Sequence, residues 1–341
     1  MEFSILMPVY MAAETLEESV QSVLDQAFDD YELLLVEDGS PDECASLCDA
    51  LAARFPERIR VIHCPHRGTI PTRREAVAEA RGDCILWLDA DDLMEADSLS
   101  CLHRLREEYN NPDMILYEFT AFYEDQRPDD LRPPLFADLT LFEGDEAKKP
   151  LFELYIRGNS LDALWAKAVR RSLYQEDPSD YGPCLSNPYG EDALHALYPL
   201  TRANRILYTD RRLTRYRIRQ NSVMHRFDKD KLAQRLNPGK WDFFEPYMKQ
   251  WGLWDEEHRT LLKASSYRGV LDGILYFMLE EGYDQKEVSA YARSFVKQHP
   301  ELKELARSPY LGRKNRLIFR LFASGRFAFL CRAIRFRRRL G

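Results

Sequence analysis

The first 110 residues alternate short, mainly apolar runs with stretches of helical periodicity. Four such runs occupy residues 3–7, 31–36, 59–64 and 84–88. Each run is too short for an ordinary helix, and polar segments with helical spacing separate it from the next run. Strands that are apolar on both faces and joined by helices form a parallel sheet covered on both sides. We therefore predict an α/β fold with a mostly parallel, Rossmann-like sheet flanked by helices.

The remaining elements follow from periodicity and from end signals. We expect Ser40 to cap a helix whose first residue is Pro41. The predicted elements are helices over 41–54, 71–81 and 145–173, strands over 114–123, 205–210 and 213–219, and only helices from about residue 228. The chain is thus expected to form an α/β domain over 1–225. A helical C-terminal region would occupy 226–341.

Composition limits the class of protein. A chain of 341 residues with 45% hydrophobic and 30% charged residues can form one large domain and a smaller one. Its net charge of −8 does not favour nucleic acid as a partner. Seven scattered cysteines without a CxxC motif indicate reduced thiols, and hence a cytoplasmic protein. We expect neither a signal peptide nor a transmembrane segment, because no basic amino-terminal region and no long apolar run is present.

Three carboxylates, Asp89, Asp91 and Asp92, directly follow the fourth apolar run. Ligands bind at the carboxyl ends of strands in open α/β sheets. Carboxylate oxygens suit Mg²⁺ or Mn²⁺, ions that accompany phosphate-bearing substrates. One aspartate could instead cap a helix beginning near Met94, but a cap needs only one. The pattern therefore favours a site for a metal ion and a diphosphate.

Two further clusters are expected at the same edge of the sheet. Pro8, Val9 and Tyr10 end the first strand, where backbone and an aromatic ring can hold a nucleobase. Asp38 and Gly39 end the second strand. An aspartate there can accept from the imino N–H of uracil, and a glycine allows close approach. The alternative for Asp38 is a turn and a helix cap.

Arg73 is predicted on the helix that precedes the acidic strand. There it can pair with a diphosphate or orient the carboxylates. A solvated helix charge is the alternative.

In this order, the motifs resemble those of the family 2 glycosyltransferases, whose catalytic domain has the GT-A fold. The resemblance covers roughly residues 1–225 and leaves the helical region uncovered. The motifs lie at 4–10 (SILMPVY), 33–40 (LLLVEDGS), 81–83 (RGD), 88–92 (LDADD), 164–167 (LWAK), 190–192 (GED) and 216–222 (YRIRQNS).

The resemblance implies nucleotide-binding and metal-binding roles. Asp89 and Asp91 match the family's DxD pair, so that Asp89 would contact ribose and Asp91 would hold Mn²⁺ or Mg²⁺ on the diphosphate. Asp38 matches the residue that reads uracil, beside Pro8, Val9 and Tyr10. His225 matches a position that supplies a further metal or phosphate contact in some relatives.

The resemblance also implies catalytic and sugar-binding roles. Asp192 matches the catalytic base of inverting enzymes, with Glu191 beside it. Without the resemblance, Asp192 can also be read as an acid favoured in the first turn of a helix by the helix dipole. Trp165 and Lys167 match a motif near the donor or acceptor sugar. The sequence departs from the family pattern at Met11, where relatives often carry Asn.

The segment 313–341 contains ten Lys or Arg and no acid, which leaves a net charge of −18 on the residues before it. Over 313–339, Phe and Ile recur at three- and four-residue steps beside arginines. Such a cationic amphipathic pattern is typical of a segment lying on a membrane surface. The alternatives are that its apolar face packs on the acidic body of the protein, or that it binds nucleic acid.

These observations together predict an inverting, metal-dependent glycosyltransferase of the hexosyltransferase type, peripheral on the inner face of the cell membrane. It would move a sugar from a nucleotide sugar, with UDP expected, to a hydroxyl of a surface glycan or lipid-linked acceptor. No glycine follows the first strand, which disfavours a sugar-phosphate nucleotidyltransferase and a dinucleotide dehydrogenase. A catalytically silent nucleotide-binding scaffold at the membrane is the alternative function.

Overall fold

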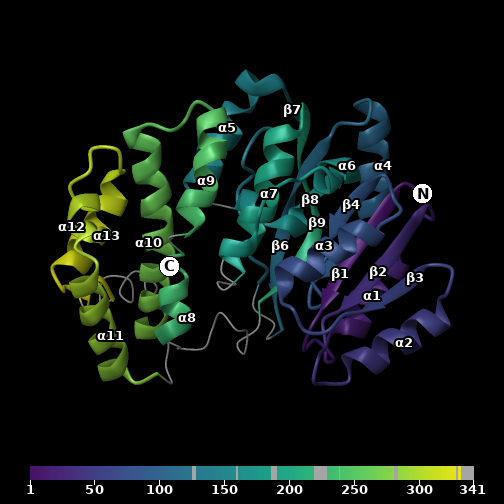
Figure 1. The fold of residues 1–341 in the computed structure, drawn as a ribbon, viewed down its shortest axis with the longest axis horizontal. Coiled ribbons are helices and arrows are strands. Elements are labelled where there is room, and N and C mark those ends of the chain that lie inside the picture. Colours follow the sequence, from purple (N-terminus) through teal and green to yellow (C-terminus); the bar gives the residue numbers. More distant parts are fainter. Residues whose placement is uncertain are drawn as a thin grey trace. The chain divides into compact units, whose positions relative to one another are not determined.

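The computed structural model describes residues 1–124, 128–158, 160–185, 190–218, 229–237, 239–279, 283–327 and 329–331. The chain divides into two compact units (Figure 1). The first unit comprises residues 1–150 and 160–222, and the second comprises 151–159 and 223–341. The boundary expected between residues 225 and 226 falls outside the described ranges and stays a prediction.

Within the described residues, the first unit contains one mixed sheet in the order β3-β2-β1-β4-β8-β6-β9-β5, with β7 also paired to β9. The strands are β1 (Phe3–Val9), β2 (Tyr31–Glu37), β3 (Ile59–His63), β4 (Cys84–Trp87), β5 (Leu93–Met94), β6 (Met114–Tyr123), β7 (Thr140–Glu143), β8 (Lys167–Arg170) and β9 (Arg205–Ile218). The helices are α1 (Leu16–Leu24), α2 (Cys44–Arg54), α3 (Thr69–Glu79), α4 (Ser98–Glu108), α5 (Gly144–Ile156), α6 (Arg171–Gln175) and α7 (Glu191–Arg202). Short 3₁₀ turns are η1 (Ser160–Asp162), η2 (Leu164–Ala166) and η3 (Gly182–Cys184).

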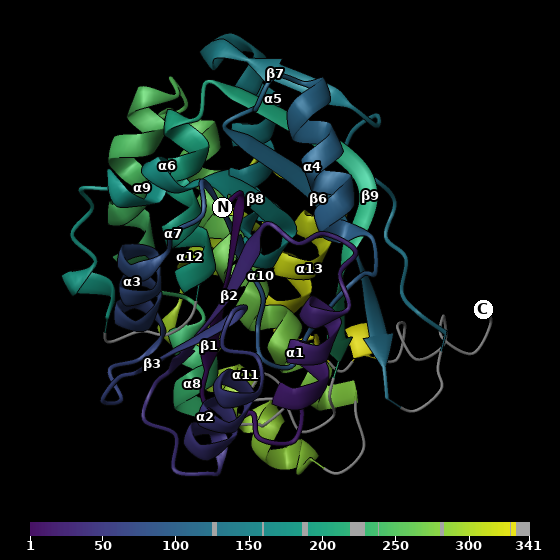
Figure 2. The same cartoon turned by 90° about the vertical axis from the view of Figure 1, so that its right-hand side faces the viewer.

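The four apolar runs form parallel neighbours, as predicted. β1 pairs in parallel with both β2 and β4, and β2 pairs in parallel with β3. All residues of β2 and β4 are buried, because helices cover both faces of this part of the sheet. Figure 2 shows α3 on one side of β1 and β2, and α1 and α4 on the other. The carboxyl ends of the four strands therefore meet at one edge.

A close approach of two backbones fixes the start of β4. A Cβ added at Gly82 would lie 2.5 Å from the carbonyl carbon of Phe3. The Gly82 N–H donates to the Ser4 hydroxyl at 2.7 Å, and that hydroxyl donates to Glu32 Oε1 at 2.6 Å. Only glycine fits here, which explains in physical terms why the RGD motif precedes the acidic strand.

Three predicted helix boundaries were wrong. Helix α2 begins at Cys44, so Ser40 is not its N-cap, and the Ser40 N–H donates instead to Glu37 Oε1. Helix α3 begins at Thr69 and ends at Glu79, two residues before the predicted positions. The residues after Asp92 form the short strand β5, so no helix begins near Met94.

The helix predicted over 145–173 was also wrong. Helix α5 ends at Ile156, and the segment continues through η1 and η2 into the strand β8. β8 lies between β4 and β6 and is antiparallel to both. The two short strands predicted over 205–219 are one long strand, β9, which runs parallel to β6 with register shifts around Glu118. These additions make the sheet mixed rather than purely parallel.

In the second unit, the described residues form helices only, as predicted from about residue 228. They are α8 (Lys229–Gln234), α9 (Gly239–Gln250), α10 (Glu256–Leu279), α11 (Gln285–Gln298), α12 (Glu301–Leu305) and α13 (Arg313–Ala323). The carboxyl-terminal end of α5 belongs to this unit. There Phe152 stacks on Trp251 with ring centroids 4.3 Å apart, and Tyr155 stacks on Phe244.

The amphipathic segment forms α13 and ends at the left-handed Gly325. Ile318, Phe319 and Phe322 are buried, as the packing alternative predicted for the apolar stripe. Among the residues placed in the structure, no helix is long and apolar enough to cross a membrane. Each of the seven cysteines is buried.

Candidate active site at the carboxyl ends of the strands

The acidic motif forms a tight turn after β4. The Asp92 N–H donates to the Asp89 carbonyl at 3.0 Å, which folds the four residues back on themselves. Asp92 is fully buried, and its Oδ1 accepts from the Arg217 N–H at 2.8 Å. Its Oδ2 is buried without a hydrogen-bond partner among the described residues. Asp92 therefore holds the turn against β9 and keeps one acceptor unused.

Arg217 of β9 clamps the same turn from its other side. Its Nε donates to the Asp91 carbonyl at 2.7 Å, and its Nη2 lies 2.5 Å from Glu18 Oε2 on α1. Nη1 reaches Glu124 Oε1 at 3.2 Å. The Arg217 side chain is buried, whereas the side chains of Glu18 and Glu124 are 59% and 53% exposed. The clamp fixes the backbone from which Asp89 and Asp91 project.

The carboxylates of the turn repel each other in a poorly solvated place. Burial raises the pKa of Asp89 to about 7, and repulsion by Asp192 and Asp91 adds to this, while Arg73 opposes it. Burial and the charges of Asp89 and Asp91 raise the pKa of Asp92 well above its ordinary value. A cation bound here would relieve the repulsion.

Arg73 connects the turn to the start of α7. Its guanidinium is buried, with Nη1 2.5 Å from Asp192 Oδ1 and its carbon 5.6 Å above the Trp87 ring. Attraction to Asp192 and Asp89 raises the pKa of Arg73 despite burial. The alternative of a solvated helix charge is therefore wrong for Arg73, which lies between two predicted site residues.

Glu191 and Asp192 begin α7 after Gly190, whose φ of 82° is left-handed. The side chain of Asp192 remains 28% exposed, so a substrate hydroxyl can reach it. Burial and repulsion by Asp192 raise the pKa of Glu191 to about 7, against the pull of Arg73. Glu191 and Asp192, the carboxylates predicted to include the catalytic base, thus lie beside Arg73 and Asp89.

The motif containing Trp165 and Lys167 has contacts within the fold. Trp165 stacks on Tyr216 with centroids 5.1 Å apart and meets Phe119 edge-on at 4.5 Å. Lys167 is buried, and its ammonium donates to the Ala163 carbonyl. Burial lowers the pKa of Lys167 to about 8, opposed by nearby carboxylates. Both residues support the floor of the site, and their contact with a sugar stays a prediction.

Asp38 organises the loop that follows β3. Its Oδ1 accepts from the Arg67 N–H at 3.0 Å, and its Oδ2 accepts from the Gly68 N–H at 3.1 Å. His66 Nδ1 lies 2.9 Å from the same Oδ2. The side chain is buried, so most of its accepting capacity is used inside the protein. Its predicted bond to uracil stays a prediction.

The nucleobase pocket predicted at the end of β1 has an aromatic platform. Tyr10 is 43% exposed and stacks on His66 with centroids 4.4 Å apart and an interplanar angle of 17°. Val9 is buried below, and Pro8 pairs in register with Val36. Met11 has a φ of 50°, a conformation that Asn adopts more readily, which accounts for the residue that relatives often carry there.

The structure therefore brings together Asp89, Asp91, Arg73, Glu191 and Asp192 around one turn. His225, the remaining predicted metal ligand, lies outside the described residues. Sequence reasoning missed His66 and the clamping role of Arg217. Arg217 stands in the quoted YRIRQNS motif, but only the pairing of β9 with β5 and β6 reveals that it faces the acidic turn.

A divalent ion fits the residues present. The unpartnered Oδ2 of Asp92 and the mutual repulsion at Asp89 are features that a cation would relieve. Among the described residues, no group of three or more His, Cys, Asp or Glu is arranged to hold a metal by itself. Mg²⁺ is commonly bound by only one or two carboxylates, with substrate phosphates and water completing the shell, so Asp89 and Asp91 would suffice.

Comparisons with known proteins show which proteins the chain is similar to. The profile described as glycosyl transferase family 2 matches residues 4–161. EpsH of Bacillus subtilis, named as a glycosyltransferase, is 27% identical over 66% of this chain and 63% of its own length. The uncharacterized glycosyltransferase EpsJ of the same species is 29% identical over 72% of this chain and 70% of its own. The chain thus spans less than two thirds of EpsH.

Solved structures agree with the fold. Residues 1–349 of S. aureus TarS superpose with a TM-score of 0.55 at 16% identity, covering 95% of this chain and 92% of that one. The same TarS segment in complex with UDP-GlcNAc gives a TM-score of 0.53. The predicted GT-A fold with a helical C-terminal region is confirmed. Over residues 4–161 the chain is thus similar to glycosyl transferase family 2.

Proposed function

We propose that this chain is an inverting hexosyltransferase that moves a sugar from a UDP-sugar to a hydroxyl of a cell-surface glycan. The observation that carries the proposal is the buried Arg73 between Asp89 and Asp192, with Nη1 2.5 Å from Asp192 Oδ1. One guanidinium thereby links the predicted nucleotide-binding carboxylate to the predicted base. TarS, which shares the fold, was solved with UDP and with UDP-GlcNAc, and this supports a UDP-sugar as donor.

The proposed reaction is a single displacement. Asp192 accepts the proton of the acceptor hydroxyl as the acceptor oxygen bonds to the anomeric carbon. The bond from that carbon to the diphosphate oxygen breaks in the same step, and UDP leaves. Arg73 holds the Asp192 carboxylate in position and places positive charge beside the leaving diphosphate. The uracil ring would stack on the solvent-exposed side of the Tyr10–His66 pair.

The proposed metal dependence rests on the acidic turn. Asp89 and Asp91 would hold Mn²⁺ or Mg²⁺ together with the diphosphate, and the ion when bound supplies Lewis-acid stabilisation of the leaving group. Arg217 would keep the turn in place because it binds the Asp91 carbonyl and two acidic side chains.

The test is release of UDP from a panel of UDP-sugars by the full chain with Mn²⁺. We expect Asp192→Asn to abolish turnover while UDP binding, measured by calorimetry, is unchanged. Glu191→Gln is the matched comparison, because it alters the adjacent carboxylate in the same way. If Asp192→Asn retains turnover and Glu191→Gln loses it, the base has been assigned to the wrong residue. UDP binding without turnover of any donor in the native protein would favour the catalytically silent scaffold.

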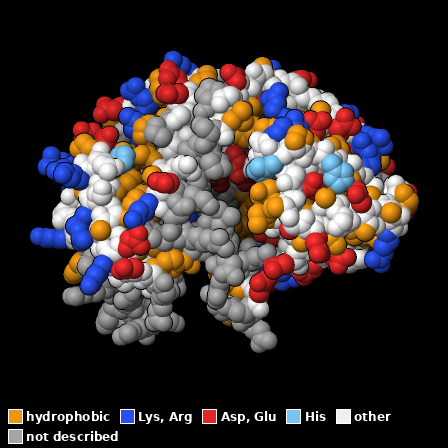
Figure 3. Space-filling model, turned by 60° about the horizontal axis from the view of Figure 1, so that its bottom comes forward, with side chains coloured by type: hydrophobic (Ala, Val, Ile, Leu, Met, Phe, Trp, Pro, Cys, Tyr) orange, Lys and Arg blue, Asp and Glu red, His pale blue; other side chains and the backbone are white. Residues whose placement is uncertain are grey.

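We also propose that α13 contacts the anionic inner face of the cell membrane. Arg313, Lys314 and Arg326 are exposed, and Figure 3 shows Lys and Arg side chains on the surface of the helical unit. Leu317 and Phe329 are 55% and 65% exposed beside them, so the segment offers both charge and apolar side chains. A glycan acceptor attached to a lipid would place the substrate at this surface.

Liposome co-sedimentation tests the membrane contact. Replacing Arg313, Lys314 and Arg326, three of the exposed basic residues of this segment, by Gln should weaken binding to anionic vesicles by ~3 kcal/mol, about a hundredfold, at ~1 kcal/mol each. The control removes the same charge from α11 by changing the exposed Lys286, Arg293 and Lys297 to Gln. Equal weakening by both triple variants would show that net charge, and not α13, governs binding.

A further inference from the structure

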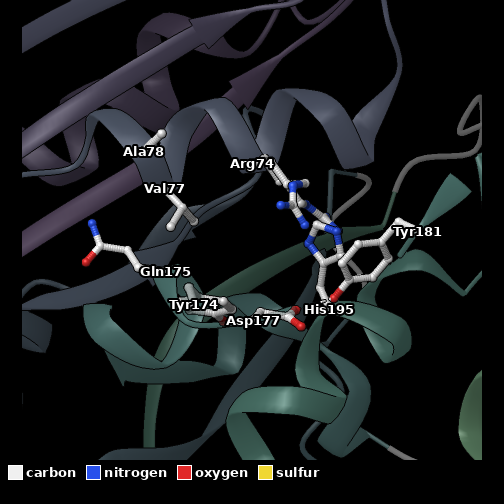
Figure 4. Close-up of a pocket in the computed structure, with 9 residues that line it drawn as sticks. Arg74, Val77, Ala78, Tyr174, Gln175, Asp177, Tyr181 and His195 are labelled. Atoms are coloured by element: carbon white, nitrogen blue, oxygen red, sulfur yellow. Dashed lines mark hydrogen bonds between the residues drawn. The ribbon is translucent and has the colours of Figure 1, made fainter. Parts of the chain in front are cut away.

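A pocket with a volume of about 380 Å³ lies beside Arg73 within the first unit. Its walls come from α3, from α6 and the turn after it, and from α7 (Figure 4). In Figure 4, Arg74, His195 and Tyr181 gather at one end, and Val77 and Gln175 lie at the other. The volume lies within the range of small-molecule sites, and the predicted site residues other than Arg73 do not line it.

His195 carries an unused hydrogen-bonding atom in this pocket. The residue is 5% exposed, and its Nε2 is buried without a hydrogen-bond partner among the described residues. Burial and the charges of Arg73 and Arg74 lower the pKa of His195 well below its ordinary value, so the ring is neutral. Leaving such a group unpaired is unfavourable, and a ligand that supplies the hydrogen bond would remove this cost.

The chemistry of the lining favours a neutral ligand with hydroxyl groups. A neutral imidazole presents Nε2 as donor or acceptor according to its tautomer, and a hydroxyl can pair with either form. Arg73 is already paired with Asp192, and Arg74 shares the lining with the carboxylate of Asp177. The two arginines are thus matched in formal charge by the carboxylates of Asp192 and Asp177, which weakens the attraction of the pocket for an anion.

The remaining walls suit the carbon–hydrogen face of a sugar ring. Val77, Tyr174 and Tyr181 supply aliphatic and aromatic surface. The Tyr181 hydroxyl donates to Asp177 Oδ2 at 2.6 Å, and the Tyr181 ring meets His195 at 4.7 Å. These contacts fix both polar groups before any ligand arrives, which lowers the entropic cost of binding.

We propose that this pocket binds a hexopyranose ring of the acceptor glycan. The inference rests on the proposed function, because it supplies the subsite from which the acceptor reaches the base. His195 lies three residues after Asp192 on α7, so the two side chains project from the same face of the helix at neighbouring turns. A ring bonded to His195 would present a neighbouring hydroxyl toward Asp192. We expect this sugar ring to bind whether or not the nucleotide is bound.

Saturation-transfer NMR on the full chain saturated with UDP and the diamagnetic ion Mg²⁺ tests the proposal. The probes are the methyl β-glycosides of glucose, galactose and N-acetylglucosamine. We expect at least one of them to receive saturation in the presence of UDP. Absence of transfer to all three, while UDP itself is bound, overturns the pocket proposal and leaves the proposed function standing. Failure of UDP to bind counts against the proposed function instead.

Two variants locate the binding. Ala78→Phe fills the pocket from the exposed face of α3 and should weaken glycoside binding at least about tenfold, with UDP affinity unchanged. Ala53→Phe makes the same change at an exposed position of α2 and should have no effect. Equal glycoside binding by both variants overturns the assignment. Displacement of the glycoside by an intact UDP-sugar but not by UDP would show that the pocket holds the donor sugar, which also overturns it.

Tyr181 separates ring packing from hydrogen bonding. Tyr181→Ala should lose glycoside binding, whereas Tyr181→Phe keeps the ring and should retain most of it. If both variants bind the glycoside like the native chain, the aromatic wall has no part in recognition and the proposal fails.

Discussion

Asp89 should destabilise the unliganded protein in a way that depends on pH. Burial and neighbouring carboxylates raise its pKa from 3.8 to about 7. The folded state therefore binds the Asp89 proton more tightly than the unfolded state does. Stability is unaffected below about pH 4, falls as pH rises from about 4 to about 7, and is constant above that. Asp89→Asn keeps the shape of the side chain and removes the charge, so it should relieve this loss.

The size of the effect follows from the two pKa values. Each unit of pKa is worth ~1.36 kcal/mol. A rise from 3.8 to about 7 therefore lowers the free energy of unfolding by ~4 kcal/mol at pH 8 and by ~1.5 kcal/mol at pH 5. The difference, ~3 kcal/mol, does not depend on how well Asn itself fits, because that contribution is the same at both pH values. Asp89→Asn should therefore stabilise the chain more at pH 8 than at pH 5.

Urea unfolding in EDTA at the two pH values measures the effect. Asp83→Asn, a change at an exposed carboxylate before β4, is the control and should show no pH dependence. The same Asp89→Asn variant should lose Mn²⁺-dependent turnover, so stability and activity would move in opposite directions. The electrostatic reasoning would be refuted if Asp89→Asn changed the free energy of unfolding equally at both pH values, or if it destabilised the chain more at pH 8 than at pH 5.

Three further changes test other parts of the fold. Arg217→Met should destabilise the chain by ~1–3 kcal/mol in urea unfolding, because it removes the donor from which the Asp91 carbonyl accepts, whereas Arg215→Met on the more exposed part of β9 should cost under ~1 kcal/mol. Tyr10→Ala should weaken UDP binding by ~1–3 kcal/mol in calorimetry through lost stacking, and Tyr10→Phe should bind normally. Gly39→Ala should destabilise the chain more than Gly252→Ala in thermal unfolding. Both glycines have a left-handed φ, but only a Cβ at Gly39 would clash, because it would lie 2.7 Å from a backbone nitrogen. Equal destabilisation by the two variants would contradict this reasoning.

The strands of the sheet's parallel part could be predicted because each one is buried on both faces. Residues 31–36 and 84–88 carry apolar side chains at nearly every position, and that composition leaves few alternatives. β8 was missed for the opposite reason. Its four residues, Lys167 to Arg170, contain two cations, and Lys167 is buried only because its ammonium reaches the Ala163 carbonyl. No local pattern indicates such a compensated burial.

The site shows the same contrast. Asp89, Asp91 and Asp192 stand at the ends of predictable elements, so sequence motifs can indicate them. The contact between Arg73 and Asp192 joins residues more than a hundred positions apart, and the sequence left Arg73 open between a ligand contact and a solvated charge. His195 and Tyr181 look like ordinary helix and loop residues. Their shared pocket with α3 exists only once three separate segments have packed.

The path of the chain between the two units limits how either could be inherited or produced alone. Residues 151–159 belong to the helical unit although both of their neighbouring segments belong to the sheet unit, so the backbone crosses between the units three times. A protein ending at residue 222 would keep Phe152 and Tyr155 but lose Trp251 and Phe244, the rings on which they stack. Exchange of helical regions among relatives at a single recombination point would place these rings against the side chains of a different helical region. The two units should therefore evolve as one gene segment and fold in mutual dependence.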